Sequence, residues 1–247
     1  MLNHKKIVFI SGLHRSGTSV LHRELSACRQ CSGFRNTGVP EDEGQHLQTV
    51  FPNAAFYGGP GEFAFNADSY LDEKSGIISE ANRSKLIKEW SKHWDLTKAV
   101  LLEKSPPNLI RTRFLQAMFP GAYFITVVRH PVAVAYATQK FSKTSISNLI
   151  NHWSRAHAIY LEDRKHLENH LTFSYEHMVE SPVDVFDAIS RFLGVAIAYQ
   201  GTLGNRNGKY FAKWAHEDKR KLQERHNAIV KSIGFCLTDL SRYSDFI

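Results

Sequence analysis

The sequence predicts an α/β protein with a central parallel sheet and helices on both faces of that sheet. Short β-rich runs alternate with amphipathic helical patterns, which is typical of a parallel sheet. A glycine-containing loop joins the first strand to the first helix, as in folds that bind phosphate at that turn. With 247 residues, 43% of them hydrophobic, the chain is long enough for one core, and we expect a single P-loop domain over residues 1–247.

The expected strands are short apolar runs, each followed by a helix candidate. They cover residues 7–11, 100–103, 123–128 and 171–174, and Phe34 marks a weaker fifth strand. Pro131 is expected to open one helix at its first position, because proline tolerates that position. Ser181 and Pro182 are expected to cap and begin another helix, which ends at Gly194.

A long helix is expected after Ser145, with apolar residues at helical spacing that core packing explains. His152 and Arg155 lie beside that stripe. Residues 52–76 form an insert rich in glycine and aromatic residues, which predicts a functional flap or a long loop. The acceptor contacts are expected in this flap and near His152 and Arg155; the flap's aromatic residues Phe56, Tyr57, Phe63 and Phe65 equally fit a core role.

Composition limits the function classes. The formal charge of +7 favours an anionic partner, but nucleic-acid binding would require aromatic and basic residues on an exposed sheet, whereas these strands are expected to be buried on both faces. Three cysteines, Cys28, Cys31 and Cys236, form neither an even disulfide framework nor a paired zinc motif. We therefore expect a cytoplasmic protein with no metal, no signal peptide and no membrane span.

The loop over residues 12–19 reads GLHRSGTS and carries the first chemical signal. It has the glycine spacing and final Ser19 of a Walker loop, but Thr18 stands where that loop has lysine. Arg15, the hydroxyls of Ser16, Thr18 and Ser19, and the amides freed by Gly17 suit an anion such as phosphate or sulfate. The missing lysine predicts a phosphate or sulfate donor that is bound differently from ATP with magnesium in a Walker loop.

Two later strands end in basic residues. Lys104 ends one strand before two prolines, and Arg129 ends another before His130 and Pro131. In an open α/β sheet ligands bind outside the carboxyl ends of the strands, so these cations should face the same crevice as Arg15. The three cations together predict a site for a multiply anionic cofactor.

These segments, with FSYEHMV at residues 173–179, resemble the sulfotransferases that use 3′-phosphoadenosine 5′-phosphosulfate (PAPS), above all the bacterial and tyrosylprotein branches. The resemblance spans most of the chain in family order and implies a P-loop α/β fold. It implies PAPS as donor, PAP as product and no metal. The acceptor would be a small molecule, a glycan or a peptide.

The resemblance also implies roles for single residues. Arg15, Ser16, Gly17, Thr18 and Ser19 would grip the 5′-phosphosulfate, Arg129 the 3′-phosphate, Tyr175 would lie by the nucleotide, and Arg206 and Lys209 would close over it. The family commonly has a serine eight residues beyond the 3′-phosphate arginine, where this chain has Ala137. Either Thr138 replaces that contact or fewer groups hold the 3′-phosphate.

Sulfuryl transfer needs cations for the developing charge and a base for the acceptor's proton. Arg15 and Lys104 are the candidates for the charge. Base candidates lie in residues 38–46, where similar tyrosylprotein enzymes place a glutamate: Glu43 first, then Glu41, then His46. Two alternatives stay open, a P-loop kinase of a small molecule and a non-catalytic nucleotide-binding or nucleic-acid-binding protein.

Overall fold

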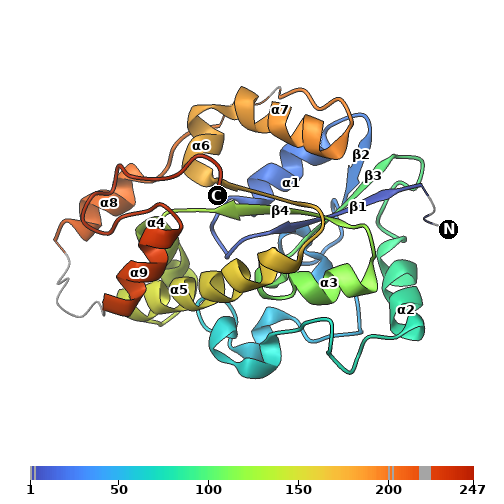
Figure 1. Cartoon of the computed structure of the whole chain (residues 1–247), viewed down its shortest axis with the longest axis horizontal. Coiled ribbons are helices and arrows are strands. Elements are labelled where there is room, and N and C mark those ends of the chain that lie inside the picture. Colours follow the sequence, from blue (N-terminus) through green and yellow to red (C-terminus); the bar gives the residue numbers. More distant parts are fainter. Residues whose placement is uncertain (1, 3, 200, 202, 217–223) are drawn as a thin grey trace.

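Five parallel strands form the centre of the molecule (Figure 1). The computed structural model describes residues 2, 4–199, 201, 203–216 and 224–247. The strands are β1 (Lys6–Ser11), β2 (Cys31–Gly33), β3 (Val100–Lys104), β4 (Tyr123–Val128) and β5 (His170–Ser174), in the order β2-β3-β1-β4-β5. The predicted fold class is confirmed, and the four main strands differ from the expected ranges by at most one residue.

Helices cover both faces of this sheet. They are α1 (Thr18–Ser26), α2 (Glu80–Trp90), α3 (Thr112–Met118), α4 (Pro131–Thr138), α5 (Ile146–Asp163), α6 (Tyr175–Glu180), α7 (Pro182–Leu193), α8 (Gly208–Trp214) and α9 (Glu224–Ser232). Figure 1 shows α1, α6 and α7 on one side of the strands and α2, α3 and α5 on the other. Side chains of α1 and α7 bury one face of the strands, and α2 and α3 bury the other, which accounts for strands that are apolar on both sides.

Several helix ends follow the predicted chemistry. Pro131 opens α4, the Ser145 side chain accepts a hydrogen bond from the Asn148 amide at the start of α5, and Gly194 ends α7 with a left-handed conformation. Ser181 stands at the N-cap of α7 and Pro182 begins the helix, as predicted, but the Ser181 side chain makes no capping hydrogen bond. Ser181 also ends α6, where its amide donates to the His177 carbonyl at 2.8 Å.

The strand predicted at Phe34 lies three residues earlier, because Cys31 pairs with Val100 in β3. Phe34 itself follows this strand and is fully buried, with its ring stacked on Trp94 at a centroid distance of 5.1 Å. The residue thus contributes to the core beside the sheet edge rather than to the strand. Phe34 is buried, as its apolar side chain indicated, but its assignment to a strand was wrong.

Residues 52–76 fold into short 3-10 turns over residues 54–57, 63–65 and 67–69. The buried guanidinium of Arg111 fastens this insert, because its Nε donates to the Ser69 carbonyl at 3.0 Å and its Nη1 to the Pro52 carbonyl at 3.2 Å. Tyr57 and Phe63 enter the core. The insert is therefore held to the body of the protein at Pro52 and at Ser69.

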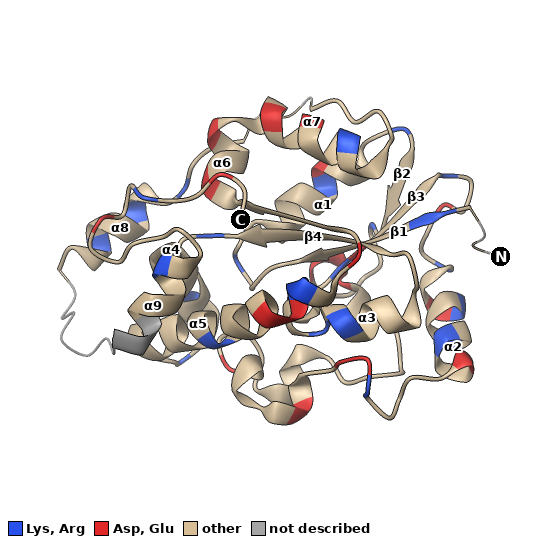
Figure 2. Ribbon diagram, in the orientation of Figure 1, with Lys and Arg blue, Asp and Glu red and all other residues tan. Residues whose placement is uncertain are grey.

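Charges are dispersed over the chain. Figure 2 shows lysines and arginines on most helices, with acidic residues among them. No helix among the described residues is both long and apolar enough to cross a membrane.

Acidification is expected to destabilise the protein, because several histidines are buried in the neutral form. Burial lowers the pKa of His22, His130 and His157 to about 4 and that of His152 to about 3. The unfolded chain takes up these protons near pH 6.5, so stability is lost as the pH falls from about 6.5 towards 4. We expect the free energy of unfolding in urea to be at least about 2 kcal/mol lower at pH 5 than at pH 7.

Three buried acids act in the opposite direction, since burial raises the pKa of Glu103 to about 7 and that of Asp163 to about 6, and also raises the pKa of Glu176. Their contribution falls as the pH rises through these values, but the histidines outnumber them. His157 stacks on Trp153, its Nδ1 lies 2.7 Å from the Trp153 carbonyl oxygen, and its Nε2 has no partner among the described residues. His157→Phe removes the titrating group and should reduce the pH dependence. Equal free energies of unfolding at pH 5 and pH 7 would contradict this account.

Candidate active site

The loop between β1 and α1 presents backbone amides at the carboxyl end of the sheet. Gly12 (φ 140°) and Gly17 (φ 104°) adopt backbone conformations that favour glycine, and Arg15 has φ 71°. A Cβ on Gly12 would lie 2.3 Å from the Val127 carbonyl oxygen, and one on Gly17 would lie 2.7 Å from the Tyr175 ring. No side chain caps α1 at Gly17, so the amides of its first turn are available to an anion.

A hollow of about 300 Å³ opens onto these amides, and we call it the loop pocket. Its lining includes most of the residues predicted to bind the cofactor: Arg15, Gly17, Thr18, Ser19, Arg129, Tyr175 and Arg206, with Val20, Arg23, Glu41, Val179, Leu203 and Gly204. Ser16 is fully buried and does not line it, and neither does Lys209, whose ammonium lies 5.1 Å from the Tyr210 ring. The loop pocket combines four arginines with one carboxylate and suits an anion.

Arg129 is held at this pocket by three elements. Its Nη1 donates to the Arg15 carbonyl at 2.8 Å, its Nε donates to the Asn207 side chain at 2.9 Å, and its guanidinium lies 4.2 Å from the centre of the Tyr175 ring. Burial lowers the pKa of Arg129. Its Nη2 is buried and has no hydrogen-bond partner among the described residues, so one donor remains for a ligand.

Asn207 and Glu176 were not predicted as site residues. The Asn207 Nδ2 donates to the Glu176 carboxylate at 2.5 Å, and the same carboxylate oxygen accepts from the His130 amide at 3.1 Å. Burial raises the pKa of Glu176. These contacts join residues 31 and 46 positions apart in the chain, which no local pattern reveals. Glu176 and Asn207 thereby orient Arg129.

Lys104 and Glu43 form a buried ion pair beside the loop pocket. The Lys104 ammonium lies 3.0 Å from Glu43 Oε1 and donates to the Glu41 carbonyl at 2.8 Å. Gln45, which was not predicted, donates to Glu43 Oε2 at 2.5 Å, and His46 Nε2 lies 3.8 Å from that oxygen. The structure thus brings Lys104 together with all three base candidates.

A second hollow of about 340 Å³ adjoins this pair, and we call it the apolar pocket. It is lined by His14, Arg15, Pro40, Glu41, Glu43, Gln45, His46, Ala54, Ala55, Pro60, Thr138 and Phe141. Arg15 and Glu41 line both pockets, so the two hollows meet at these residues. Thr138, expected at the 3′-phosphate, lies in the apolar pocket and not in the loop pocket.

The flap contributes to the apolar pocket through residues other than its large aromatic ones. Ala54, Ala55 and Pro60 line the pocket, whereas Phe56 is 74% exposed and Phe65 is 47% exposed. His152 is buried and accepts a hydrogen bond from the Ala64 amide at 3.1 Å, so it fixes the insert instead of facing the pocket. Arg155 is exposed and lines neither pocket.

His14 is a pocket residue that the sequence analysis did not assign. Desolvation and the nearby Lys104 charge lower the pKa of His14 to about 3, so its imidazole is neutral at pH 7. Its position inside the glycine loop was the signal that indicated it. The ring adds a polar but uncharged group to the apolar pocket.

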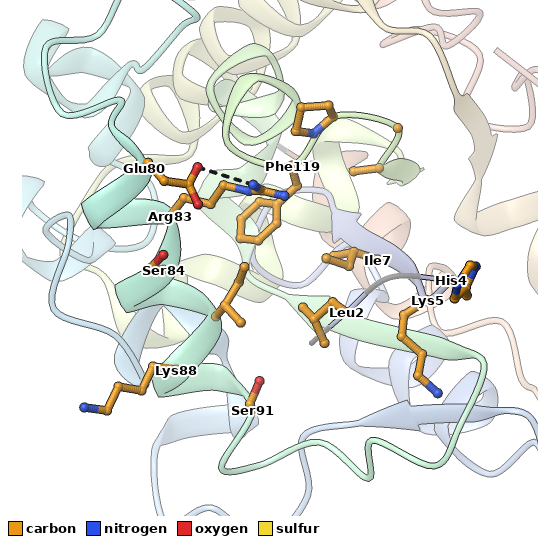
Figure 3. Close-up of a pocket in the computed structure, with 14 residues that line it drawn as sticks. Leu2, His4, Lys5, Ile7, Glu80, Arg83, Ser84, Lys88, Ser91 and Phe119 are labelled. Atoms are coloured by element: carbon orange, nitrogen blue, oxygen red, sulfur yellow. Dashed lines mark hydrogen bonds and ion pairs between the residues drawn. The ribbon is translucent and has the colours of Figure 1, made fainter.

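A larger hollow, of about 830 Å³, lies at the opposite ends of the strands, between α2 and the turn before β4 (Figure 3). Figure 3 shows Leu2, Ile7 and Phe119 around it, with the Glu80 and Arg83 pair on α2. No residue of the glycine loop lines this hollow. The candidate active site is therefore the smaller pair of pockets.

The model of the sulfotransferase family matches residues 8–199, which is most of the chain. The chain belongs to the sulfotransferase family. The protein is accordingly an enzyme of sulfuryl transfer, and neither the kinase nor the non-catalytic alternative is favoured. The matched range contains Arg15, Glu43, Lys104 and Arg129, and it ends before the segment with Arg206 and Asn207.

Solved structures agree on the fold of this sulfotransferase. The sulfotransferase domain from the curacin biosynthetic pathway is 17% identical, with 92% of this chain and 97% of that chain covered and a TM-score of 0.59. A sulfotransferase from Alicyclobacillus acidocaldarius is 16% identical, with 92% and 95% covered and a TM-score of 0.51. One from Mycobacterium avium is 15% identical, with 93% and 76% covered and a TM-score of 0.53. No curated protein is significantly similar in sequence.

Metal ligands do not gather at either pocket. Within the described ranges, no three histidine, cysteine, aspartate or glutamate side chains form a group that suits a metal ion. The expectation that the enzyme uses no metal stays a prediction.

Proposed function

We propose that this sulfotransferase moves the sulfuryl group of PAPS to a hydroxyl or amine acceptor and releases PAP. The observation that supports this best is the meeting of two unlike pockets at Arg15 and Glu41. The loop pocket offers arginines and free amides for an anionic donor, and the apolar pocket offers a space for an acceptor beside a carboxylate. A transferred group would cross the junction of the two pockets.

The residues of the loop pocket fit a nucleotide with phosphates at two positions. The amides of the α1 first turn, with Thr18, Ser19 and Arg15, suit the 5′-phosphosulfate. The spare donor of Arg129 suits the 3′-phosphate, and Tyr175 offers a ring beside it. Arg206 also lines this pocket and supplies a further positive charge.

We assign two roles to the residues around the junction: stabilising the developing charge and accepting the acceptor's proton. In the transfer, the sulfur leaves the bridging oxygen of the donor and bonds to the acceptor oxygen, whose proton passes to a base. We assign Arg15 and Lys104 to stabilising the charge on the transferring oxygens. Arg15 lines both pockets, whereas Lys104 is buried, lines neither pocket and is paired with Glu43 at 3.0 Å. Glu43 lines the acceptor side and is our first choice for the base, with Glu41 and His46 behind it.

Arg129→Ala is expected to weaken PAP binding by at least about tenfold, because charge-assisted hydrogen bonds are worth about 1.5–3 kcal/mol. The loss should be specific to the 3′-phosphate, so binding of adenosine 5′-monophosphate should change much less. Titration calorimetry with both nucleotides measures this difference. Arg155→Ala, which removes an exposed arginine outside both pockets, is the control. An equal loss for both nucleotides would contradict the assignment.

A thermal-shift comparison tests the donor against the kinase alternative. PAP should stabilise the protein more than ADP with magnesium does. Glu103, the one acidic strand end considered for magnesium, is buried and accepts from Ser105 at 2.6 Å and from Asn108 at 2.5 Å. It lines neither pocket.

The cytoplasmic location expected from the cysteines stays a prediction.

A further inference from the structure

Five of the twelve residues that line the apolar pocket have side chains that cannot hydrogen-bond, and most of the accessible surface of the pocket belongs to apolar atoms. Pro40 precedes the base candidates, Ala54, Ala55 and Pro60 come from the insert, and Phe141 follows α4. Phe141 is 65% exposed and stands at the rim. Binding an apolar body here would remove both surfaces from water, and this favours an apolar acceptor.

The charges at this pocket are already balanced. Arg15 and Glu41 carry opposite charges, and the second carboxylate, Glu43, is paired with Lys104 at 3.0 Å. The Arg15 guanidinium lies 5.3 Å from the Phe141 ring centre and also faces the loop pocket, where the donor's negative charge would engage it. An acidic acceptor would meet two carboxylates, and the one arginine among the described lining residues, Arg15, would be shared with the donor.

The volume of about 340 Å³ lies at the lower end for ligand pockets. Several of its polar side chains already have partners: Gln45 bonds to Glu43 and to the Ala54 amide, and His46 contacts Asn53. The neutral His14 and the Thr138 hydroxyl, which has no hydrogen-bond partner among the described residues, remain for an acceptor. A sugar chain carries many hydroxyls that this lining would leave unpaired, at a cost for each. The pocket therefore suits a small molecule with one reacting hydroxyl.

We propose that the acceptor is a small, uncharged phenol or alcohol with an apolar body, held between residues 54–60 and Phe141. This inference rests on the proposed function and narrows it. Glycan and acidic-peptide acceptors are the competing outcomes.

Transfer of labelled sulfate from PAPS to four acceptors tests the class: 2-naphthol, 1-octanol, an acidic tyrosine peptide and a neutral trisaccharide. We expect kcat/KM for 2-naphthol and 1-octanol to exceed the values for the peptide and the trisaccharide by at least about tenfold. Calorimetry should also detect 2-naphthol binding to the enzyme saturated with PAP. A preference for the peptide or the trisaccharide would overturn the inference.

Two variants test where the acceptor binds. Each places a tryptophan in the insert, at neighbouring positions. Ala55→Trp should fill the pocket and raise the KM for 2-naphthol by at least about tenfold, whereas Phe56→Trp should leave it within about twofold, because Phe56 points to solvent. The Kd for PAP should stay unchanged in both variants, which also shows that both fold. Equal effects of the two substitutions would contradict the assigned site.

The outcomes separate the two levels of the proposal. If PAP does not bind and no acceptor is sulfated, the proposed function fails. If PAP binds tightly but neither neutral acceptor binds or reacts, the donor assignment stands and the inference about the acceptor is overturned.

Discussion

Lys104→Ala is expected to lower kcat by at least about a hundredfold while the Kd for PAP stays within about twofold of the wild-type value. The ammonium is the one strand-end cation that the loop pocket does not expose, and it reaches the acceptor side through its pair with Glu43. Its loss removes charge stabilisation from the transfer but no lining residue from the loop pocket. Steady-state kinetics with 2-naphthol and calorimetry with PAP measure the two quantities.

Folding must be separated from chemistry in this variant, because removing one partner of a buried pair leaves an unpaired charge. The double variant Glu43→Ala, Lys104→Ala carries no such charge and should recover thermal stability but not turnover. Lys165→Ala, which removes an exposed lysine from a surface pair, is the matched control. A double variant with turnover near the wild-type value would exclude a chemical role for Lys104.

Glu43→Ala is likewise expected to cost at least about a hundredfold in kcat with PAP binding largely intact, since Glu43 lines the acceptor side alone. Glu43→Gln should be about as inactive, because an amide keeps the shape of the side chain but cannot accept the proton. The carboxylate is held by Lys104 and Gln45 at 3.0 and 2.5 Å, so its effect as a base comes from its position.

The two other base candidates provide the comparison for Glu43. Glu41 is exposed and its backbone is left-handed (φ 52°), and His46 lies 3.8 Å from Glu43. Glu41→Gln and His46→Ala should each retain most of the turnover. Near-normal turnover in Glu43→Gln would move the role to one of these two residues.

Much of the site follows from where residues stand at strand ends. β3, β1 and β4 are neighbours in the sheet, so Lys104, the loop with Arg15, and Arg129 emerge side by side. Because parallel strands all end on one edge, a strand pattern and a basic residue after it suffice to predict this clustering. The same reasoning does not predict where a side chain points when it lies in an irregular segment or on a helix that is buried on all sides.

Thr138 and the flap show that limit. Thr138 follows Ala137 on α4, where every residue is buried, so the sequence pattern does not distinguish the side that faces the loop pocket from the side that faces the insert. In the flap, the aromatic residues were expected to contact the acceptor. Tyr57 and Phe63 instead pack in the core, and Phe56 faces solvent. Small residues beside them form the pocket wall.

The sequence by itself determined the α/β class, the anion-binding loop, the three strand-end cations and the family, because each depends on local periodicity or on residues at strand ends. Only the tertiary structure decided that Asn207 and Glu176 orient Arg129, that Gln45 holds Glu43, and that two pockets meet at Arg15 and Glu41. The contacts among Asn207, Glu176 and Arg129 join residues that are far apart in the chain, so they depend on how the loops pack against the sheet. The shape and charge balance of the acceptor pocket, and with them the kind of molecule it suits, are properties of that packing.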